Sequence, residues 1–303
     1  MSSASSTTFR PFNLALIQLG QITADKPTNL QHARTMVLKA AAGGDDPKTK
    51  PDLIVLPEVF NSPYGAQHFP VYAEPVDFVP GQPYDPAASP SDSVRMLSAV
   101  AKETGVWLIG GSIPERGADN KLYNTTTVYS PQGELVAVHR KVHLFDIDIP
   151  GKITFKACPP PALSGLTDDA HFARIGLGIC YDVRFPELAA INARQGCQVL
   201  IYPGAFNLTT GPLHWELLQR ARAVDNQVYF AMCSPARDLT AGYHAWGHSM
   251  VVDPMGKVVA GTTQDEDIVY ARIDPQTFHD ARAGIPVTTQ RRFDVYPDVS
   301  AGL

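Results

Sequence analysis

Charge and cysteine are both scarce in this 303-residue chain. Only 18% of the residues are charged, and 30 acidic against 25 basic side chains leave a formal net charge of −5. A general nucleic-acid binder carries the opposite excess, so we expect no nucleic-acid partner. The four cysteines include no C-x-x-C pair and no dense framework. This pattern indicates reduced thiols in an intracellular protein and not a disulfide scaffold.

Long apolar runs are also missing. No stretch approaches the roughly 18 apolar residues that cross a bilayer, so we expect no membrane association. Residues 1–10 lack the apolar segment of a secretory signal, and we interpret them as a flexible tail. Their Ser/Thr-rich composition faintly resembles a transit peptide, so a mitochondrial location stays open beside a cytoplasmic one. With 44% apolar residues, the chain has ample material for the core of an enzyme-sized globule.

Short apolar runs alternate with helical patterns through residues 11–284, which we interpret as one domain, followed by an extended C-terminal arm over 285–303. The first half is predicted as β-α-β-α-β-β-β. Its strands are expected over 13–19, 52–56, 106–109, 123–129 and 134–139, and its helices around 30–40 and 94–101. The second half roughly repeats this order, with strands over 172–180, 199–202, 228–232, 248–252, 258–261 and 268–273, and helices over 186–195 and 217–228. Two such halves can stack two sheets face to face, so we expect an α/β fold, a four-layer α-β-β-α sandwich.

Three residues follow buried strands in a way that suggests chemistry. Cys180 ends the apolar run 175–179 shortly before a predicted helix, where the helix dipole favours a thiolate and an oxyanion site. Glu58 follows the apolar run 53–56 and Lys141 follows the strand 134–139. Ligands bind at the carboxyl ends of strands in open α/β sheets. Taken alone, each residue also fits an ordinary role as a buried cysteine, a solvated glutamate or an exposed lysine.

The segments around these residues resemble the three signature segments of the nitrilase superfamily. They are Leu-Pro-Glu at 56–58, Arg-Lys-Val-His-Leu-Phe-Asp at 140–146 and Gly-Ile-Cys-Tyr-Asp-Val-Arg-Phe-Pro-Glu at 178–187. The resemblance runs in order over nearly the whole chain and implies the α-β-β-α sandwich, usually as a dimer, and no cofactor. It also implies a catalytic triad of Glu58, Lys141 and Cys180 that hydrolyses amides through a cysteine thioester. The oxyanion would be held by Lys141 and the backbone N–H of Tyr181.

Segments 145–152, 202–212 and 221–227 further resemble the ω-amidase branch of this superfamily. Its members hydrolyse the terminal amide of α-ketoglutaramate and α-ketosuccinamate, which implies a small-molecule amide substrate here. Such a substrate needs a cation for its far carboxylate, and Arg184 is the nearest candidate. We expect four further side chains to shape the pocket: Tyr64, Phe206, Thr209 and Thr210.

One departure from the family pattern leaves alternatives open. Family members carry a second glutamate sixteen positions after the triad lysine, where this chain has Ala157. The alternatives to an ω-amidase are a hydrolase of deaminated glutathione or another small amide, and a catalytically weak scaffold member. His139 and His143 have metal-ligand spacing but lack an H-E-x-x-H motif, so we expect no metal. The sequon at Asn124 is interpreted as a chance match.

Overall fold

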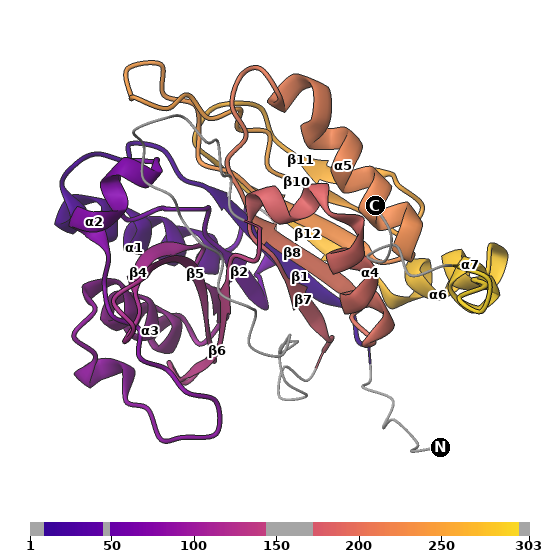
Figure 1. Ribbon diagram of the computed structural model, residues 1–303, viewed down its shortest axis with the longest axis horizontal. Helices are drawn as coiled ribbons and strands as arrows, with labels where there is room; N and C mark the ends of the chain where they lie inside the picture. Colours follow the sequence, from indigo (N-terminus) through magenta and orange to yellow (C-terminus); the bar gives the residue numbers. More distant parts are fainter. Residues whose placement is uncertain (1–8, 45–48, 144–171, 297–303) are drawn as a thin grey trace.

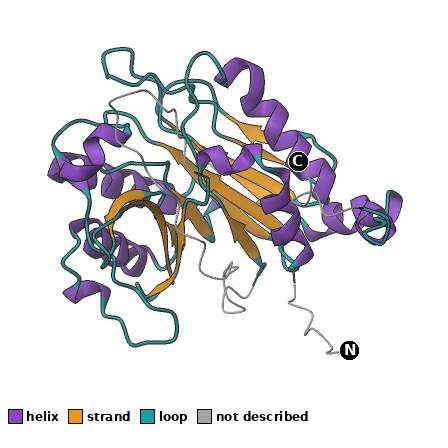
Figure 2. Cartoon of the chain, viewed as in Figure 1, coloured by secondary structure: helices purple, strands orange, loops and turns teal. Residues whose placement is uncertain are grey.

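The computed structural model describes residues 9–44, 49–143 and 172–296. Within these ranges the chain forms two β-sheets that face each other, with helices on both outer sides (Figures 1 and 2). The strands are β1 (Phe12–Gln18), β2 (Leu53–Val55), β3 (Trp107–Ile109), β4 (Ile113–Arg116), β5 (Leu122–Tyr129), β6 (Leu135–Arg140), β7 (Ile175–Leu177), β8 (Val199–Pro203), β9 (Tyr229–Cys233), β10 (Met250–Val252), β11 (Val258–Gly261) and β12 (Asp267–Ile273). The helices are α1 (Lys26–Ala42), α2 (Phe69–Tyr72), α3 (Asp92–Thr104), α4 (Pro186–Arg194), α5 (Gly211–Asn226), α6 (Pro275–Gly284) and α7 (Val287–Gln290). The expected four-layer α-β-β-α sandwich is confirmed.

The two sheets differ in composition. Among the described residues, the first has the order β12-β1-β2-β3-β5-β4, and β6 pairs with the other edge of β5. The second has the order β11-β10-β9-β8-β7. Strands β1, β2 and β3 are parallel, as are β7, β8 and β9. Because the carboxyl ends of parallel strands share one edge, the segments that follow β2 and β7 are available for a common site.

Strand β1 shows how the layers are held. Leu14 and Leu16 belong to the core between the sheets, whereas Ala15 and Ile17 belong to the core under α1 and α3. The alternation follows from the strand geometry, in which successive side chains point to opposite faces. Each fully buried leucine contributes roughly 1.5–3 kcal/mol. The near-continuous apolar run of β1 is therefore required by burial on both faces.

The helices begin and end at residues whose chemistry suits those positions. The Asp25 side chain accepts a hydrogen bond from the Thr28 N–H at the start of α1, and Ser91 does the same for Val94 at the start of α3. These contacts satisfy N–H groups that the first turn leaves free. Helix α3 ends at Gly105, whose φ of +64° lies in the left-handed region that glycine adopts without strain.

Two strands differ from the sequence-based expectation. Strand β4 was not expected, because it is short and contains Pro114 beside two charged residues. It lies at an edge of the first sheet, where proline is tolerated. Strand β12 comes from the second half of the chain but pairs antiparallel with all seven residues of β1 in the first sheet. The two halves therefore do not each form their own sheet.

The ends of the described chain also differ from expectation. Phe9 and Arg10 pack against the domain: the Phe9 ring lies 5.3 Å from that of Phe278, and the Arg10 N–H donates to the Phe172 carbonyl at 2.7 Å. After the unexpected helix α6, the segment expected to be an extended arm begins with the short helix α7. Residues 1–8 and 297–303 of these two terminal segments lie outside the described residues. No helix within the described ranges has the length and apolar character needed to cross a membrane.

Candidate active site

Glu58, Lys141 and Cys180 converge at the edge where β2, β6 and β7 end. The Lys141 Nζ atom lies 2.8 Å from Glu58 Oε1, although 83 residues separate the two in sequence. All three side chains are buried. The structure therefore brings together the three residues that the sequence singled out as a triad.

The segment after β2 is shaped to hold Glu58 in place. The Ser112 N–H donates to the Pro57 carbonyl at 3.2 Å, and the Ser112 hydroxyl accepts from the Val59 N–H at 3.1 Å. Gly111 has a φ of +60°, and a Cβ atom there would lie only 2.1 Å from the Pro57 carbonyl oxygen. The turn that carries Glu58 therefore packs directly against the backbone at Gly111, where only glycine fits.

Cys180 occupies a strained turn. It is the first residue of a short 3₁₀ helix, Cys180–Arg184, and has a φ of +46°. Non-glycine residues rarely adopt this region, and such strain clusters at functional sites. The expected strand over 172–180 is accordingly shorter, ending at Leu177. The Ala205 N–H lies 3.5 Å from the Cys180 Sγ, and the sulfur lies 3.6 Å from the Ala205 carbonyl oxygen.

The electrostatic surroundings keep the thiol protonated at rest. Burial, and then the negative charge of Glu58, raise the pKa of Cys180 to about 12, while Lys141 lowers it only partly. Burial alone would lower the pKa of Lys141, but the attraction of Glu58 and Cys180 raises it overall. Lys141 is therefore a fixed ammonium, and Cys180 needs a base to become a nucleophile. Glu58 lies close enough to the thiol to raise its pKa and can serve as that base.

Glu58 has two further hydrogen-bond partners. Asn124 Nδ2 donates to Oε1 at 2.9 Å, and the Tyr64 hydroxyl donates to Oε2 at 3.1 Å. Tyr64 was expected in the pocket, but Asn124 was not connected with it. The only signal at Asn124 was the sequon, which carries no information about this contact.

A buried carboxylate links the segments that carry Lys141 and Cys180. Asp182 accepts hydrogen bonds from the backbone N–H and the ring Nδ1 of His143, and from the Ile179 N–H. The His139 Nε2 lies 3.6 Å from its second oxygen. His139 and His143 therefore share a carboxylate. Within the described ranges, no group of three or more potential ligand side chains could hold a metal ion.

Arg184, the residue predicted to bind the far carboxylate of the substrate, lies over the ring of Phe206. Its guanidinium is 4.6 Å from the Phe206 ring centroid and 5.8 Å from that of Tyr181. Nη1 lies 3.1 Å from the Nδ1 atom of His214, a neighbour that sequence reasoning missed. Because guanidinium only donates, Nδ1 accepts, and the His214 ring proton is placed on Nε2.

The remaining predicted pocket residues lie in a local turn. Asn207 Oδ1 accepts hydrogen bonds from the backbone N–H groups of Thr209 and Thr210 and from the Thr210 hydroxyl. Thr209 is exposed and Thr210 is half-buried directly before α5. Their expected contact with substrate stays a prediction, as does the role of the Tyr181 backbone N–H.

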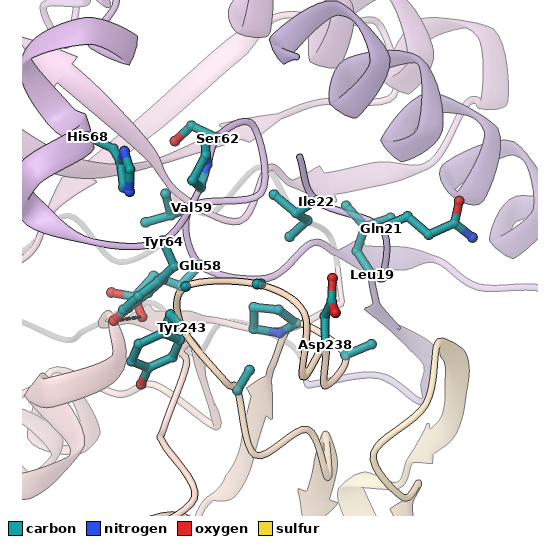
Figure 3. Close-up of a pocket in the computed structure, with 17 residues that line it drawn as sticks. Leu19, Gln21, Ile22, Glu58, Val59, Ser62, Tyr64, His68, Asp238 and Tyr243 are labelled. Atoms are coloured by element: carbon teal, nitrogen blue, oxygen red, sulfur yellow. Dashed lines mark hydrogen bonds between the residues drawn. The ribbon is translucent and has the colours of Figure 1, made fainter. Parts of the chain in front are cut away.

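A small cavity of about 80 Å³ opens next to Glu58 (Figure 3). Tyr64 and Tyr243 lie on the Glu58 side of it, with their ring centroids 4.2 Å apart and the ring planes tilted by 33°, and Asp238 lies on the far side. The Tyr243 hydroxyl donates to the Ala205 carbonyl at 2.7 Å. The tyrosine pair therefore touches both the carboxylate and the peptide beside the thiol.

The other described cysteines have no comparable surroundings. Burial raises the pKa of Cys197 to about 12, and Cys233 lies under β1 with its Sγ 3.1 Å from the Ile17 carbonyl. Both fit the role of buried apolar side chains. Cys158 and Ala157, the departure from the family pattern, lie outside the described residues.

Comparison with known proteins agrees with this geometry. The carbon-nitrogen hydrolase family model matches residues 13–283. The ω-amidase NIT2 of Mus musculus is 53% identical over 94% of this chain and 96% of its own length. The ω-amidase NIT3 of Saccharomyces cerevisiae is 47% identical over 99% of both chains. The crystal structure of S. cerevisiae Nit3, a member of branch 10 of the nitrilase superfamily, superposes with a TM-score of 0.82, 43% identity and coverage of 96% of this chain and 100% of that one. From the site and these matches together, the chain belongs to the carbon-nitrogen hydrolase family, the nitrilase superfamily.

Proposed function

We propose that this protein is an ω-amidase, which hydrolyses the terminal amide of α-ketoglutaramate or α-ketosuccinamate to the dicarboxylic keto acid and ammonia. The observation that carries the proposal is the buried Glu58–Lys141 pair, 2.8 Å apart, beside the strained Cys180 thiol. Relatives about half identical over nearly their full length are named ω-amidases, which supports the substrate class.

In the first half of the reaction, Glu58 accepts the Cys180 proton as the sulfur attacks the amide carbon. The resulting oxyanion is held by the Lys141 ammonium and by the Tyr181 backbone N–H. The tetrahedral intermediate then collapses: the C–N bond breaks, Glu58 returns its proton to the nitrogen, and ammonia leaves. The acyl group remains on Cys180 as a thioester.

In the second half, water replaces ammonia. Glu58 takes a proton from the water as its oxygen attacks the thioester carbon, and Lys141 again stabilises the oxyanion. The C–S bond breaks and the thiol regains its proton from Glu58, so the enzyme returns to its starting state. One amide and one water are consumed, and one carboxylic acid and one ammonia are formed.

Recognition of the far carboxylate is assigned to Arg184, with His214 as its partner. The position of Arg184 over the Phe206 ring holds the guanidinium in place, and the Nε2 proton of His214 adds a second donor. The Tyr64 side chain and the turn that carries Thr209 and Thr210 complete the proposed pocket.

We further propose that the protein works as a homodimer in the cytoplasm, with the mitochondrion kept open as an alternative. Helix α5 presents Leu213, Leu217 and Val224 to solvent, although the last two belong to the apolar pattern that predicted this helix. A second copy of the chain would cover this face. Sedimentation velocity of the protein and of Leu217→Asp tests the assembly, and cell fractionation tests the location.

Steady-state ammonia release from α-ketoglutaramate, with Cys180→Ala as the control, tests the activity. We expect turnover by the parent protein and none by the variant, with a trapped acyl mass on Cys180 in the parent. Absence of ammonia release from both keto-acid amides would overturn the substrate assignment. Normal turnover by Cys180→Ser would overturn the covalent scheme.

A further inference from the structure

The Glu58 carboxylate has a specific pattern of occupied and open acceptor positions. Its two oxygens offer about four lone-pair sites in all. Lys141 Nζ at 2.8 Å and Asn124 Nδ2 at 2.9 Å both donate to Oε1, and the Tyr64 hydroxyl donates to Oε2 at 3.1 Å. Two donors fill Oε1 and one occupies Oε2. The remaining acceptor position is therefore on Oε2.

Asn124 is well placed to enforce this pattern. It lies on β5, next to the strand β6 that leads to Lys141, and it is 94% buried, since its exposed fraction is 6%. Its side chain donates to Glu58, while its backbone carbonyl accepts from the Lys141 N–H at 2.8 Å. One residue thus fixes the carboxylate and the start of the lysine segment together.

We propose that Asn124 is a positioning residue that, together with Lys141, closes Oε1 of Glu58 and leaves Oε2 as the oxygen that receives the Cys180 proton. Tyr64 completes the arrangement by occupying the other acceptor position of Oε2, which fixes the plane of the carboxylate. The proton moves from Sγ to Oε2, and no donor has to leave before it arrives. This inference rests on the proposed function only for the identity of the base.

The pH dependence of turnover tests the assignment. Asn124→Leu keeps the branching and the number of side-chain heavy atoms but removes a donor from the ionised carboxylate. Hydrogen bonds to a charged group are worth about 1.5–3 kcal/mol, or roughly one to two pH units. We therefore expect the acid limb of kcat/KM to move to higher pH by about one unit. Tyr64→Phe removes the donor on Oε2 and should move the limb in the same direction.

Two matched controls separate this role from a structural one. Thr126→Val alters the same strand two residues away, at a buried hydroxyl with no hydrogen-bond partner in the described chain, and should leave the profile unchanged. Tyr243→Phe removes the hydroxyl of the ring that packs against Tyr64. This hydroxyl contacts Ala205 and not Glu58, so its removal should leave the acid limb in place. Thermal unfolding of each variant establishes that it is folded.

Infrared titration of the carboxyl band, taken as the difference from Glu58→Gln, measures the same shift without substrate. Failure of ammonia release together with a shifted band in Asn124→Leu would reject the proposed substrate but support the positioning role. A folded Asn124→Leu whose acid limb and carboxyl band match the parent protein would overturn it, even if kcat fell. If Asn124→Leu does not fold, the pH profile of Tyr64→Phe decides. An acid limb at higher pH supports the assignment of Oε2, and an unshifted limb overturns it.

Discussion

The Asp182 carboxylate accepts two hydrogen bonds from His143, one from the backbone N–H and one from ring Nδ1, each 2.9 Å long. His143 lies two residues after Lys141, and Asp182 lies two residues after Cys180. The pair therefore joins the lysine segment to the nucleophile turn. A shift of this carboxylate would change the spacing between the ammonium and the sulfur.

Asp182 gives the fold a defined acid sensitivity. Burial raises the pKa of Asp182, but the nearby ring of His139 together with hydrogen bonds from His143 and Ile179 outweighs it and holds the pKa well below its usual range. A depressed pKa stabilises the folded state above the unfolded value of about 3.9 and loses that contribution as the pH falls. Asp182→Asn should lower the free energy of unfolding at pH 7 by about 3 kcal/mol and flatten its decline between about pH 5 and 2.

Urea denaturation at a series of pH values measures both effects. Asp119→Asn is the control. The pKa of Asp119 is also lowered, to about 2, by hydrogen bonds from Lys121 and Tyr123, yet this carboxyl group is exposed to solvent. Solvent screening makes such pairs weak, so the control should follow the parent curve. Parallel curves for Asp182→Asn and the parent protein would contradict the assignment.

The two charges beside the thiol act on it in opposite directions. Glu58 raises the pKa of Cys180 and Lys141 lowers it. Glu58→Gln should therefore move the pKa of Cys180 below its value of about 12, whereas Lys141→Met should move it higher. Turnover should fall in both, by roughly 10²–10⁴ where general base catalysis is lost and 10²–10³ where an oxyanion donor is lost. In Glu58→Gln, a lower pKa of the Cys180 thiol should thus coincide with slower turnover.

Ultraviolet absorbance of the thiolate during a pH titration follows this pKa. Each variant is compared with the same variant carrying Cys180→Ala, so that the other cysteines cancel. Shifts of the same sign in Glu58→Gln and Lys141→Met would show that the pair does not control the thiol electrostatically.

The sequence predicts the sandwich from its alternating apolar runs, and it predicts the triad because three short segments resemble the signature segments of the nitrilase superfamily. Apolar runs followed by Glu58, Lys141 and Cys180 are visible without coordinates, and the parallel order of the strands then places their ends together. The apolar spacing over residues 94–101 similarly predicts α3. Local chemistry of this kind is readable in a single pass along the chain.

The contacts around the triad could not be predicted in the same way. Asn124 and Glu58 are 66 residues apart, and Arg184 and His214 are 30 apart. No periodicity marks either pair, because each depends on strand register and on the orientation of one side chain. The pairing of β12 with β1 was missed for the same reason, since two apolar strands at opposite ends of the chain suit many partners.

Gly111 is expected to be irreplaceable next to the glutamate turn. Alanine there would combine a left-handed φ of +60° with a Cβ atom 2.1 Å from the Pro57 carbonyl oxygen. Gly105→Ala is a matched control, because its φ is +64° but nothing lies within 4 Å of the added atom. Strain alone costs about 1–2 kcal/mol, so Gly105→Ala should lose about that much stability.

Gly111→Ala should lose clearly more stability than Gly105→Ala, and its amidase activity should fall because Glu58 is displaced. Equal losses of stability in denaturant titrations would show that the backbone yields without cost at Gly111.

Arg184 should discriminate between charged and uncharged substrates. The far carboxylate of α-ketoglutaramate is expected to accept hydrogen bonds from its guanidinium, each worth about 1.5–3 kcal/mol. Arg184→Met should therefore raise KM for α-ketoglutaramate by roughly tenfold or more, while KM for an uncharged amide of similar length changes little. Arg184→Lys keeps the charge but loses the planar donor pair, so its KM should lie between those of the parent and Arg184→Met.

Initial rates of ammonia release with both amides measure the difference in KM. An equal rise in KM for the two amides would mean that Arg184 supports the pocket only through its packing on Phe206, and the carboxylate would then have to bind elsewhere.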